Sequence, residues 1–360
     1  MSYLGAPTTD ISDAGSLVRA MGSLAQRYRR IVADPGSASR FTDAQPVRRT
    51  GFTAELQVAG VDVAATDVAV ITLVRPDGAA LPAWTPGAHI DVFTSIGRQR
   101  HYSLTGDPAD SGSYRIAVRR IPDGAGSAEM HDLREGDTVR IRGPRNAFRV
   151  TDEPAYHFIA GGIGITPILP MIRVAAARGS RWTLDYLGRS RSTLPFLSEL
   201  ESLARTGTLR IRCDDEHGEP EIADLFAGDD YRTPVFLCGP TGLMDAVTTY
   251  LDGQPVRPRV HSERFTAPAV RGETPFTAVL ARSGLTVEVG PDESALTAIR
   301  RQLPIVNYSC QQGFCGACKT TVLDGQVDHR DRVLVGDELA DSMMICVSRG
   351  AGGCQVVLDL

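Results

Sequence analysis

The chain has 360 residues, of which 42% are hydrophobic and 22% are charged, and its formal net charge is -5. This length and apolar content predict two or three domains with cores of ordinary size. The acidic balance argues against nucleic-acid binding, because domains that bind nucleic acids usually present a basic face.

The first 46 residues are expected to form an N-terminal extension. Residues 13–33 gather apolar side chains on one helical face, which predicts an amphipathic helix. Packing back onto the chain and docking to another surface both stay open for this helix. The N-terminus lacks the pattern of a signal peptide, and no apolar run approaches the roughly 20 residues that span a bilayer. We therefore expect a cytoplasmic protein without membrane contact.

Residues 47–150 contain short β-rich runs, such as "VAVITLVRP" and "YRIAVRR", separated by Gly, Pro and Asp. Such runs predict an antiparallel barrel or sandwich. In residues 151–265, strand-like runs such as "YHFIAG" and "RWTLDYLG" alternate with the helical stretches "TPILPMIRVAAARG" and "TLPFLSELESLAR". This alternation predicts a parallel sheet with helices on its faces. Residues 266–275 are predicted to be a linker, and residues 276–360 a final domain.

Two turns of the predicted parallel sheet have the features of a nucleotide site. In "FIAGGIGITP", Gly162 and Gly164 follow a strand, and Thr166 and Pro167 begin a helix. Glycines let backbone N–H groups approach a pyrophosphate, and a helix N-terminus adds partial positive charge. The usual third glycine is missing, so this turn alone is compatible with a purely structural role. A second turn, "CGP" at residues 238–240, ends another strand at the same carboxyl edge, where ligands of such sheets bind.

The β-rich region contains a candidate site for a flat, polar-edged ring. Arg100, Tyr102 and Ser103 lie on one predicted strand in "RHYS", and the turn "DGAGS" places Gly126 and Ser127 after two arginines. The cation, aromatic face and hydroxyl suit a planar ring, and the turn suits a phosphate. A half-exposed strand without a ligand is an equally good interpretation of these residues alone.

Four of the seven cysteines follow a metal-binding spacing. Cys310, Cys315 and Cys318 lie in "CQQGFCGACK", and the next cysteine in the chain is Cys346. An odd number of cysteines in a reducing compartment argues against a disulfide framework. Zinc sites usually pair two short Cys/His hairpins, whereas C-x4-C-x2-C with a distant fourth cysteine is the plant-type [2Fe-2S] spacing. The remaining cysteines at 213 and 354 are expected to be small buried apolar residues.

In this order, the motifs resemble those of the phthalate dioxygenase reductase family, which includes vanillate demethylase reductases. The resemblance covers about residues 48–360. It implies a flavin-binding β-barrel over residues 47–150, an NAD(P)-binding α/β domain over 151–265 and a β-grasp ferredoxin domain over 276–360. FMN is expected rather than FAD, because the barrel of this family binds FMN. The turn "DGAGS", one residue shorter than the usual phosphate turn, and His101 between Arg100 and Tyr102 are departures from the family pattern.

The resemblance also implies roles for individual residues. Cys238 would lie near the nicotinamide, and Glu263 near the flavin edge. The implied flavin contacts are Arg100, Tyr102, Ser103, Ala117, Val118, Arg119, Gly126 and Ser127. The implied nucleotide contacts are Gly162, Gly164, Thr166, Pro167, Gly239 and Pro240. The implied cluster ligands are Cys310, Cys315, Cys318 and Cys346.

The expected activity is electron transfer from NADH or NADPH to a protein acceptor. A hydride carries two electrons and a [2Fe-2S] cluster accepts one, so a flavin between them converts pairs into single electrons. Arg189 and Arg191 follow the second strand of the parallel sheet and suit the 2'-phosphate of NADPH, whereas the resemblance leans to NADH. A Rieske-type oxygenase is the expected acceptor. A cytochrome P450 acceptor and a flavin and iron-sulfur redox sensor are the alternatives.

Overall fold

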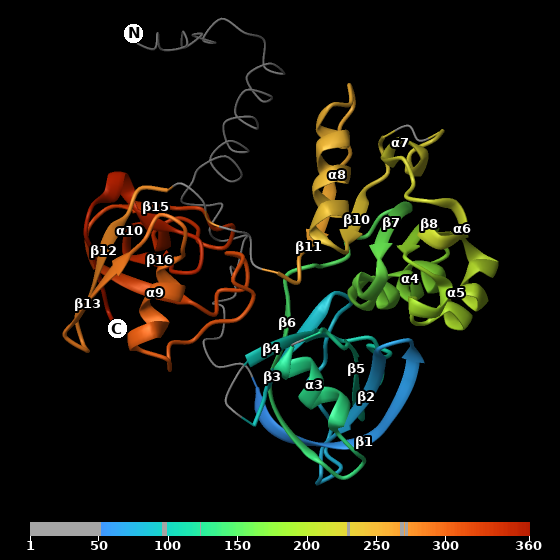
Figure 1. Cartoon of the computed structure of the whole chain (residues 1–360), viewed down its shortest axis with the longest axis horizontal. Coiled ribbons are helices and arrows are strands. Elements are labelled where there is room, and N and C mark those ends of the chain that lie inside the picture. Colours follow the sequence, from blue (N-terminus) through green and yellow to red (C-terminus); the bar gives the residue numbers. More distant parts are fainter. Residues whose placement is uncertain (1–51, 96–98, 123, 229–230, 267–269, 271–272) are drawn as a thin grey trace, which may run out of the picture. The chain divides into compact units, whose positions relative to one another are not determined.

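The computed structural model describes residues 52–95, 99–122, 124–228, 231–266, 270 and 273–360 (Figure 1). The helix predicted over residues 13–33 lies outside these residues. The described chain forms three larger sheets, one from each predicted domain, and a two-stranded sheet. No helix among the described residues has both the length and the apolar composition that crossing a membrane requires.

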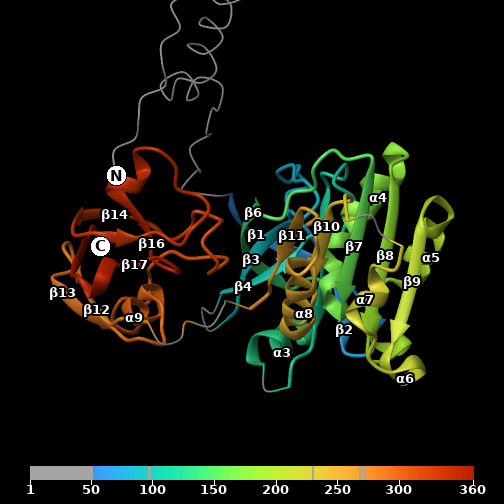
Figure 2. The same ribbon diagram turned by 90° about the horizontal axis from the view of Figure 1, so that it is seen from above.

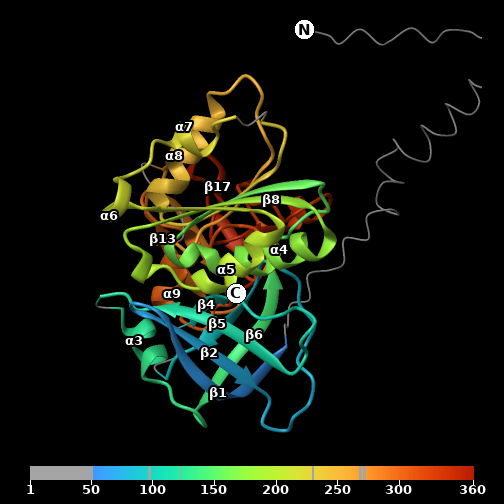
Figure 3. The same cartoon turned by 90° about the vertical axis from the view of Figure 1, so that its right-hand side faces the viewer.

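The first sheet is antiparallel, as its short alternating runs predict, and has the strand order β4-β3-β6-β1-β2-β5. Figure 3 labels five of its strands, β1, β2, β4, β5 and β6. Its strands are β1 (Thr53–Ala65), β2 (Val68–Val74), β3 (Ala88–Phe93), β4 (Gln99–Ser103), β5 (Ser113–Arg119) and β6 (Thr138–Asn146). The chain just after β4 meets β5 through an isolated bridge between Leu104 and Ile116. Helix α3 (Ala125–Asp132) connects β5 to β6.

The second sheet is parallel, with the order β11-β10-β7-β8-β9 (Figure 2). Its strands are β7 (Ala155–Gly161), β8 (Arg181–Gly188), β9 (Thr208–Cys213), β10 (Val235–Cys238) and β11 (Val260–Glu263). Its helices are α4 (Ile165–Arg178), α5 (Leu197–Leu203), α6 (Asp214–His217), α7 (Ile222–Leu225) and α8 (Thr241–Asp252). Helices α4 and α5 contribute to one hydrophobic core of this sheet, and α7 and α8 contribute to the other.

The predicted helix over "TLPFLSELESLAR" is shorter than expected. Only α5 is α-helical, and 3-10 turns flank it at Arg191–Thr193 and Ala204–Thr206. Pro195 explains the late start, because a proline disfavours helical backbone at the residue before it. Phe196 then has a positive φ of 65° and separates the proline from the helix.

The third sheet is mixed, with the order β13-β12-β18-β14-β16. Its strands are β12 (Phe276–Leu280), β13 (Leu285–Val289), β14 (Lys319–Asp324), β16 (Ser342–Met344) and β18 (Val356–Leu358), and β15 (Val327–Asp328) pairs separately with β17 (Arg349–Gly350). Helix α9 (Ala295–Gln302) packs Leu296 and Ile299 into the core, and α10 (Glu338–Asp341) precedes β16. Only β12 and β18 are parallel neighbours, whereas the other pairs are antiparallel.

Candidate functional site

The two predicted nucleotide turns contact each other at the carboxyl edge of the parallel sheet. Gly164 caps α4, and a Cβ atom at this position would lie only 2.2 Å from the backbone oxygen of Cys238. Only glycine therefore lets the first turn approach the second so closely. Thr166 and Pro167 lie buried in the first turn of α4, where the missing N–H of a proline is not needed.

A cavity of about 460 Å³ brings together the motifs that the sequence singled out. Its walls include Arg100, Tyr102 and Ser103 from β4, Thr166 from α4 and Glu263 at the end of β11. Further predicted residues on the wall are Ala117, Arg119, Gly126, Ser127 and the cysteine Cys310. Residues from all three larger sheets or their connecting segments therefore meet around one space.

The N-terminus of α3 forms part of the wall of this cavity. Gly126 is buried against Arg100, since a Cβ atom there would lie 2.8 Å from Arg100 Nε. The Ser127 hydroxyl donates to the Gly124 carbonyl at 2.9 Å and accepts from the Ile121 N–H at 3.0 Å, which fixes the turn. A glycine at the start of a helix, beside an arginine, fits a phosphate group.

Two buried polar side chains on the cavity wall lack hydrogen-bond partners for some of their atoms. Among the described residues, neither ring nitrogen of His89 nor Glu263 Oε2 has a partner. The His89 Nδ1 and Glu263 Oε1 atoms are 3.9 Å apart. Such unsatisfied buried atoms are costly, and a bound ring with polar edges would satisfy them. The site residues therefore fit a flavin.

Burial shifts the pKa values of both groups toward the neutral form. It lowers the pKa of His89 to about 4, with a further contribution from nearby His101. It raises the pKa of Glu263 to about 8, against the opposing effect of a hydrogen bond with Ser103. The cavity wall is consequently free of charge at both positions near pH 7.

His89 did not emerge from the sequence reasoning. The observation that places His89 at the site is the register of β3 and β4, in which His89 lies opposite Ser103. That pairing depends on tertiary structure, so the sequence "GAHIDVF" gives no local indication of it.

Several predicted residues lie outside the cavity wall. Cys238 is fully buried in the core beneath α4, and burial together with nearby Glu263 raises the pKa of its thiol. It pairs with Glu263 across β10 and β11. The other predicted flavin and nucleotide residues that do not line the cavity are Val118, Gly162, Gly164, Pro167, Arg189, Arg191, Gly239 and Pro240.

The four predicted cluster cysteines come together as two pairs. The neighbouring Cys315 raises the pKa of the Cys310 thiol, and Cys346 does the same to the Cys318 thiol, so the members of each pair lie close enough to interact. Cys315 also acts electrostatically on Cys318. Cys315 is the more accessible of the four, and the others are buried. The Gln312 N–H donates to Cys310 Sγ at 3.3 Å, as expected of a loop whose N–H groups stabilise negative sulfur.

Strand pairing explains why a cysteine so distant in sequence joins this loop. Strand β14 begins directly after Cys318, and β16 ends two residues before Cys346. The strands are antiparallel and pair Lys319 with Met344, so the start of β14 lies beside the end of β16. Two thiols for each of two irons is the ligand set of a [2Fe-2S] cluster, and the four residues fit it.

The remaining metal-site candidates are weaker. Among the described residues, only Cys213, Asp215 and Glu216 converge their ligand atoms within 4.8 Å of one another, and Glu216 already pairs with Arg191. Cys213 is buried, as expected. The expectation for Cys354 is wrong: this residue is exposed, because it follows a 3-10 turn outside the sheet core.

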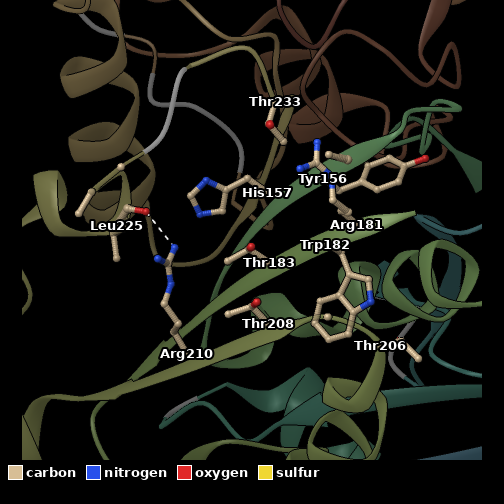
Figure 4. A pocket seen from close by; sticks show the side chains of 14 residues that line it. Tyr156, His157, Arg181, Trp182, Thr183, Thr206, Thr208, Arg210, Leu225 and Thr233 are labelled. Atoms are coloured by element: carbon tan, nitrogen blue, oxygen red, sulfur yellow. Dashed lines mark hydrogen bonds between the residues drawn. The ribbon is translucent and has the colours of Figure 1, made fainter. Parts of the chain in front are cut away.

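A second cavity, of about 580 Å³, lies at the opposite end of the parallel strands (Figure 4). The ends of β7, β8 and β9 that line it are the amino ends, at Tyr156, Trp182 and Thr208. Arg210 projects across it and donates to the Leu225 carbonyl at 3.0 Å. Because ligands of parallel α/β sheets bind at the carboxyl ends, this cavity is not the nucleotide site.

The comparisons with known proteins agree with this site. A model of the oxidoreductase FAD-binding domain matches residues 56–150, and a model of the 2Fe-2S iron-sulfur cluster binding domain matches residues 279–350. Phthalate dioxygenase reductase from Burkholderia cepacia is 39% identical over 316 residues, which cover 85% of this chain and 97% of that protein.

Two solved structures are also similar. A structure of phthalate dioxygenase reductase is 36% identical, with a TM-score of 0.61, over 86% of this chain and 98% of that chain. An intact type IV self-sufficient cytochrome P450 monooxygenase is 34% identical, with a TM-score of 0.70, over 89% of this chain. The match covers 44% of the P450 chain.

These matches confirm the resemblance noted in the sequence. The chain belongs to the phthalate dioxygenase reductase family, whose members are reductase subunits of dioxygenase and monooxygenase systems, and it transfers electrons from NAD(P)H through a flavin and a [2Fe-2S] cluster.

Proposed function

We propose that this reductase binds FMN in the 460 Å³ cavity, takes its electrons from NADH and delivers them to a Rieske-type terminal oxygenase. The observation that carries the proposal is the shared wall of that cavity, to which the flavin motif, the nucleotide turn and the cluster loop all contribute. A flavin in this position supplies the conversion of a hydride into single electrons.

The proposed units are a flavin-binding barrel over residues 47–150, a nucleotide-binding unit over 151–265 and a β-grasp cluster unit over 276–360, joined by the linker 266–275. The bridge that joins the chain after β4 to β5 supports closure of the barrel. The parallel sheet and the mixed sheet support the other two units.

The proposed flavin contacts follow from the cavity wall. Arg100, Tyr102 and Ser103 contact the ring, together with the β5 residues Ala117 and Arg119. Val118 lies between them but packs into the core of the flavin sheet and does not line the wall. Gly126 and Ser127 hold the phosphate at the N-terminus of α3. Glu263 orients the edge of the flavin ring, because its buried carboxyl is protonated at neutral pH and can donate a hydrogen bond.

The proposed nucleotide site lies at the turns that close the carboxyl edge of the parallel sheet. The residues assigned to the pyrophosphate are Gly162, Gly164, Thr166, Pro167, Gly239 and Pro240. Cys238 supports the nicotinamide end from beneath, because it is buried under Gly164 and pairs with Glu263. Four thiols, those of Cys310, Cys315, Cys318 and Cys346, ligate the cluster.

FAD is the second candidate for the flavin, and the match of residues 56–150 to an FAD-binding domain model favours it. Room for an adenylate exists in a neighbouring pocket of about 490 Å³ whose lining includes Arg120, Pro122 and Ala125. Gly126 and Ser127 line the main cavity itself, next to Arg100, which favours FMN, whose phosphate is terminal. Mass spectrometry of the flavin released from the purified protein decides between them, and a mass equal to that of FAD would reject this part of the proposal.

The proposed preference for NADH rests on the ion pair between Arg191 and Glu216. Its Nε atom donates to Glu216 Oε1 at 2.8 Å, so its charge is already neutralised at the edge where the 2'-phosphate of NADPH would lie. Asp214 and Asp215 add negative charge beside it in α6. Carboxylates there repel a phosphate and leave ribose hydroxyls unaffected.

We expect Glu216→Gln to shift the coenzyme preference toward NADPH. Freeing Arg191 raises the ratio of kcat/KM for NADPH to that for NADH by about twofold to fivefold, which is the range expected of an exposed ion pair. Asp152→Asn is the matched control, because Asp152 forms an exposed pair with Arg178 at 3.2 Å. Equal ratios in wild type, Glu216→Gln and the control would show that Arg191 does not contact the 2'-phosphate.

The Rieske-type acceptor follows from the similarity to phthalate dioxygenase reductase, and a cytochrome P450 is the second candidate because of the P450 match. Incubation of the NADH-reduced protein with a purified Rieske-type oxygenase and, separately, with a purified P450 tests the choice. Faster reduction of the Rieske centre supports the proposal. Faster reduction of the P450 haem rejects the acceptor and leaves the electron path intact.

A further inference from the structure

A buried carboxylate joins the flavin-binding sheet to the cluster loop. Asp91 on β3 is fully buried, and its Oδ1 atom accepts a hydrogen bond from the Ser309 hydroxyl at 2.8 Å. Ser309 directly precedes the cluster ligand Cys310 in sequence and is itself 1% exposed. A buried carboxylate is costly unless positive charges and hydrogen-bond donors surround it. The partners of Asp91 therefore show what stabilises the contact between β3 and the cluster loop.

Two arginines of β6 compensate the charge of Asp91, and a histidine of β4 lies beside it. Arg142 Nε lies 3.0 Å from Asp91 Oδ2, and Arg145 pairs with the same oxygen atom. His101 Nε2 lies 3.3 Å from Asp91 Oδ1. Burial opposes ionisation of Asp91, but the neighbouring charges outweigh it and hold the pKa of this carboxyl below its usual value.

Arg142 also binds the cluster segment directly. Its Nη2 atom donates to the Tyr308 carbonyl at 2.7 Å, and its Nη1 atom donates to Asn307 Oδ1 at 3.2 Å. Gln99 Nε2 donates to the same Tyr308 carbonyl at 2.8 Å, and Gln99 Oε1 accepts from Arg142 at 3.0 Å. Three consecutive residues, 307–309, are thus held by side chains of β3, β4 and β6.

The held segment lies directly before Cys310, a residue that the two redox sites share. Gln99, His101 and Cys310 line the cavity together, so the segment leads straight from the proposed flavin wall into the first cluster ligand. On the far side of Cys310, the Gln312 side chain donates to the Arg264 carbonyl just after β11. The loop that carries Cys310 is therefore fixed on both sides.

We propose that Asp91, Gln99 and Arg142 are positioning residues that set the separation of the flavin and the cluster by holding residues 307–309. This inference rests on the proposed binding of the flavin in the cavity and of the cluster by Cys310 and its partners. The three residues take part in no bond breaking. The two electrons of each hydride leave the cavity singly, and these residues fix only the path over which each moves.

Arg142→Gln tests the proposal, with Arg140→Gln as its matched control. Both arginines lie on β6 and above the Phe93 ring, but Arg140 is exposed. The first readout is amide hydrogen exchange in residues 307–312, which does not depend on electron transfer. We expect these amides to exchange faster in Arg142→Gln than in wild type, and at the wild-type rate in Arg140→Gln. The melting temperature of the parallel-sheet unit should be unchanged in both variants.

The second readout separates the two electron-transfer steps after NADH is mixed with the intact protein. Loss of flavin absorbance reports hydride transfer, and the EPR signal of the reduced cluster in rapidly frozen samples reports the following step. We expect Arg142→Gln to leave the first rate within twofold and to slow the second by about tenfold or more, because small displacements of reacting groups have effects of this size.

Ser309→Ala is the milder second variant, in case Arg142→Gln fails to incorporate a cluster. It removes only the hydroxyl that bonds to Asp91 and should change both readouts in the same direction. Unchanged exchange and an unchanged cluster rate in these variants overturn the positioning role alone. A wild-type protein that binds no flavin, or whose cluster is never reduced by NADH, would instead overturn the proposed function.

Discussion

Cys346→Ser is expected to abolish the [2Fe-2S] cluster while leaving the flavin reducible by NADH. Cys346 is the ligand farthest in sequence from the loop, and its thiol pairs with that of Cys318. Without it, one iron of the pair would lose a thiolate ligand. Flavin reduction should continue, since no cysteine of the cluster other than Cys310 lines the flavin cavity.

The measurement combines the EPR spectrum of the reduced protein with transfer to a protein acceptor. We expect the cluster signal and the acceptor reduction to be lost together, and bleaching of the flavin by NADH to stay within about threefold of wild type, as expected of separate sites. Cys354→Ser is the control, because Cys354 is an exposed cysteine in the same part of the chain. A normal cluster signal in Cys346→Ser would exclude Cys346 as a ligand.

Glu263→Gln is expected to stabilise the protein at alkaline pH. The folded pKa of about 8 lies above the ordinary value of 4.5, so the folded protein binds this proton more tightly than the unfolded chain does. The free energy of unfolding therefore falls as the pH rises from 4.5 to about 8, and the loss is complete above that value. A glutamine stays neutral and avoids the loss.

Thermal or urea unfolding at pH 6 and pH 9 measures this effect. Each unit of pKa shift corresponds to about 1.4 kcal/mol, so we expect the advantage of Glu263→Gln over wild type to grow by about 2–4 kcal/mol across this range. Glu201→Gln is the control, because Glu201 is exposed on α5. An advantage that is the same at both pH values would mean that Glu263 is ionised in the folded protein throughout.

The same substitution should alter the pH profile of flavin reduction by NADH. Below pH 8 the protonated Glu263 can donate a hydrogen bond to the ring edge, and above pH 8 it loses the donated proton. We expect the wild-type rate to decline on the alkaline side and the Glu263→Gln rate to stay level, because an amide remains a donor. Parallel profiles for the two proteins would contradict the role proposed for Glu263.

The local motifs carried most of the functional prediction. The spacing of Cys310, Cys315 and Cys318 predicts a [2Fe-2S] cluster, because in plant-type ferredoxins one short loop supplies three of the four thiolate ligands. The glycine turn before α4 was also recognisable as a motif, although the contact that requires glycine at position 164 is a tertiary one, with the backbone of Cys238. The alternation of strands and helices likewise predicted the parallel sheet. The helix predicted from residue 193 begins only at Leu197, because Pro195 disfavours helical backbone at the residue before it.

What the sequence by itself determined, then, is the set of cofactor motifs and the type of the first two sheets, because both depend on neighbours in the chain. Only the tertiary structure decided that His89 lies opposite Ser103, that Arg191 is paired with Glu216 and that Asp91 holds Ser309. Each of these depends on strand register or on contacts between distant segments, which residue spacing does not encode. Burial in such contacts, rather than residue type, is also what raises the pKa of Glu263.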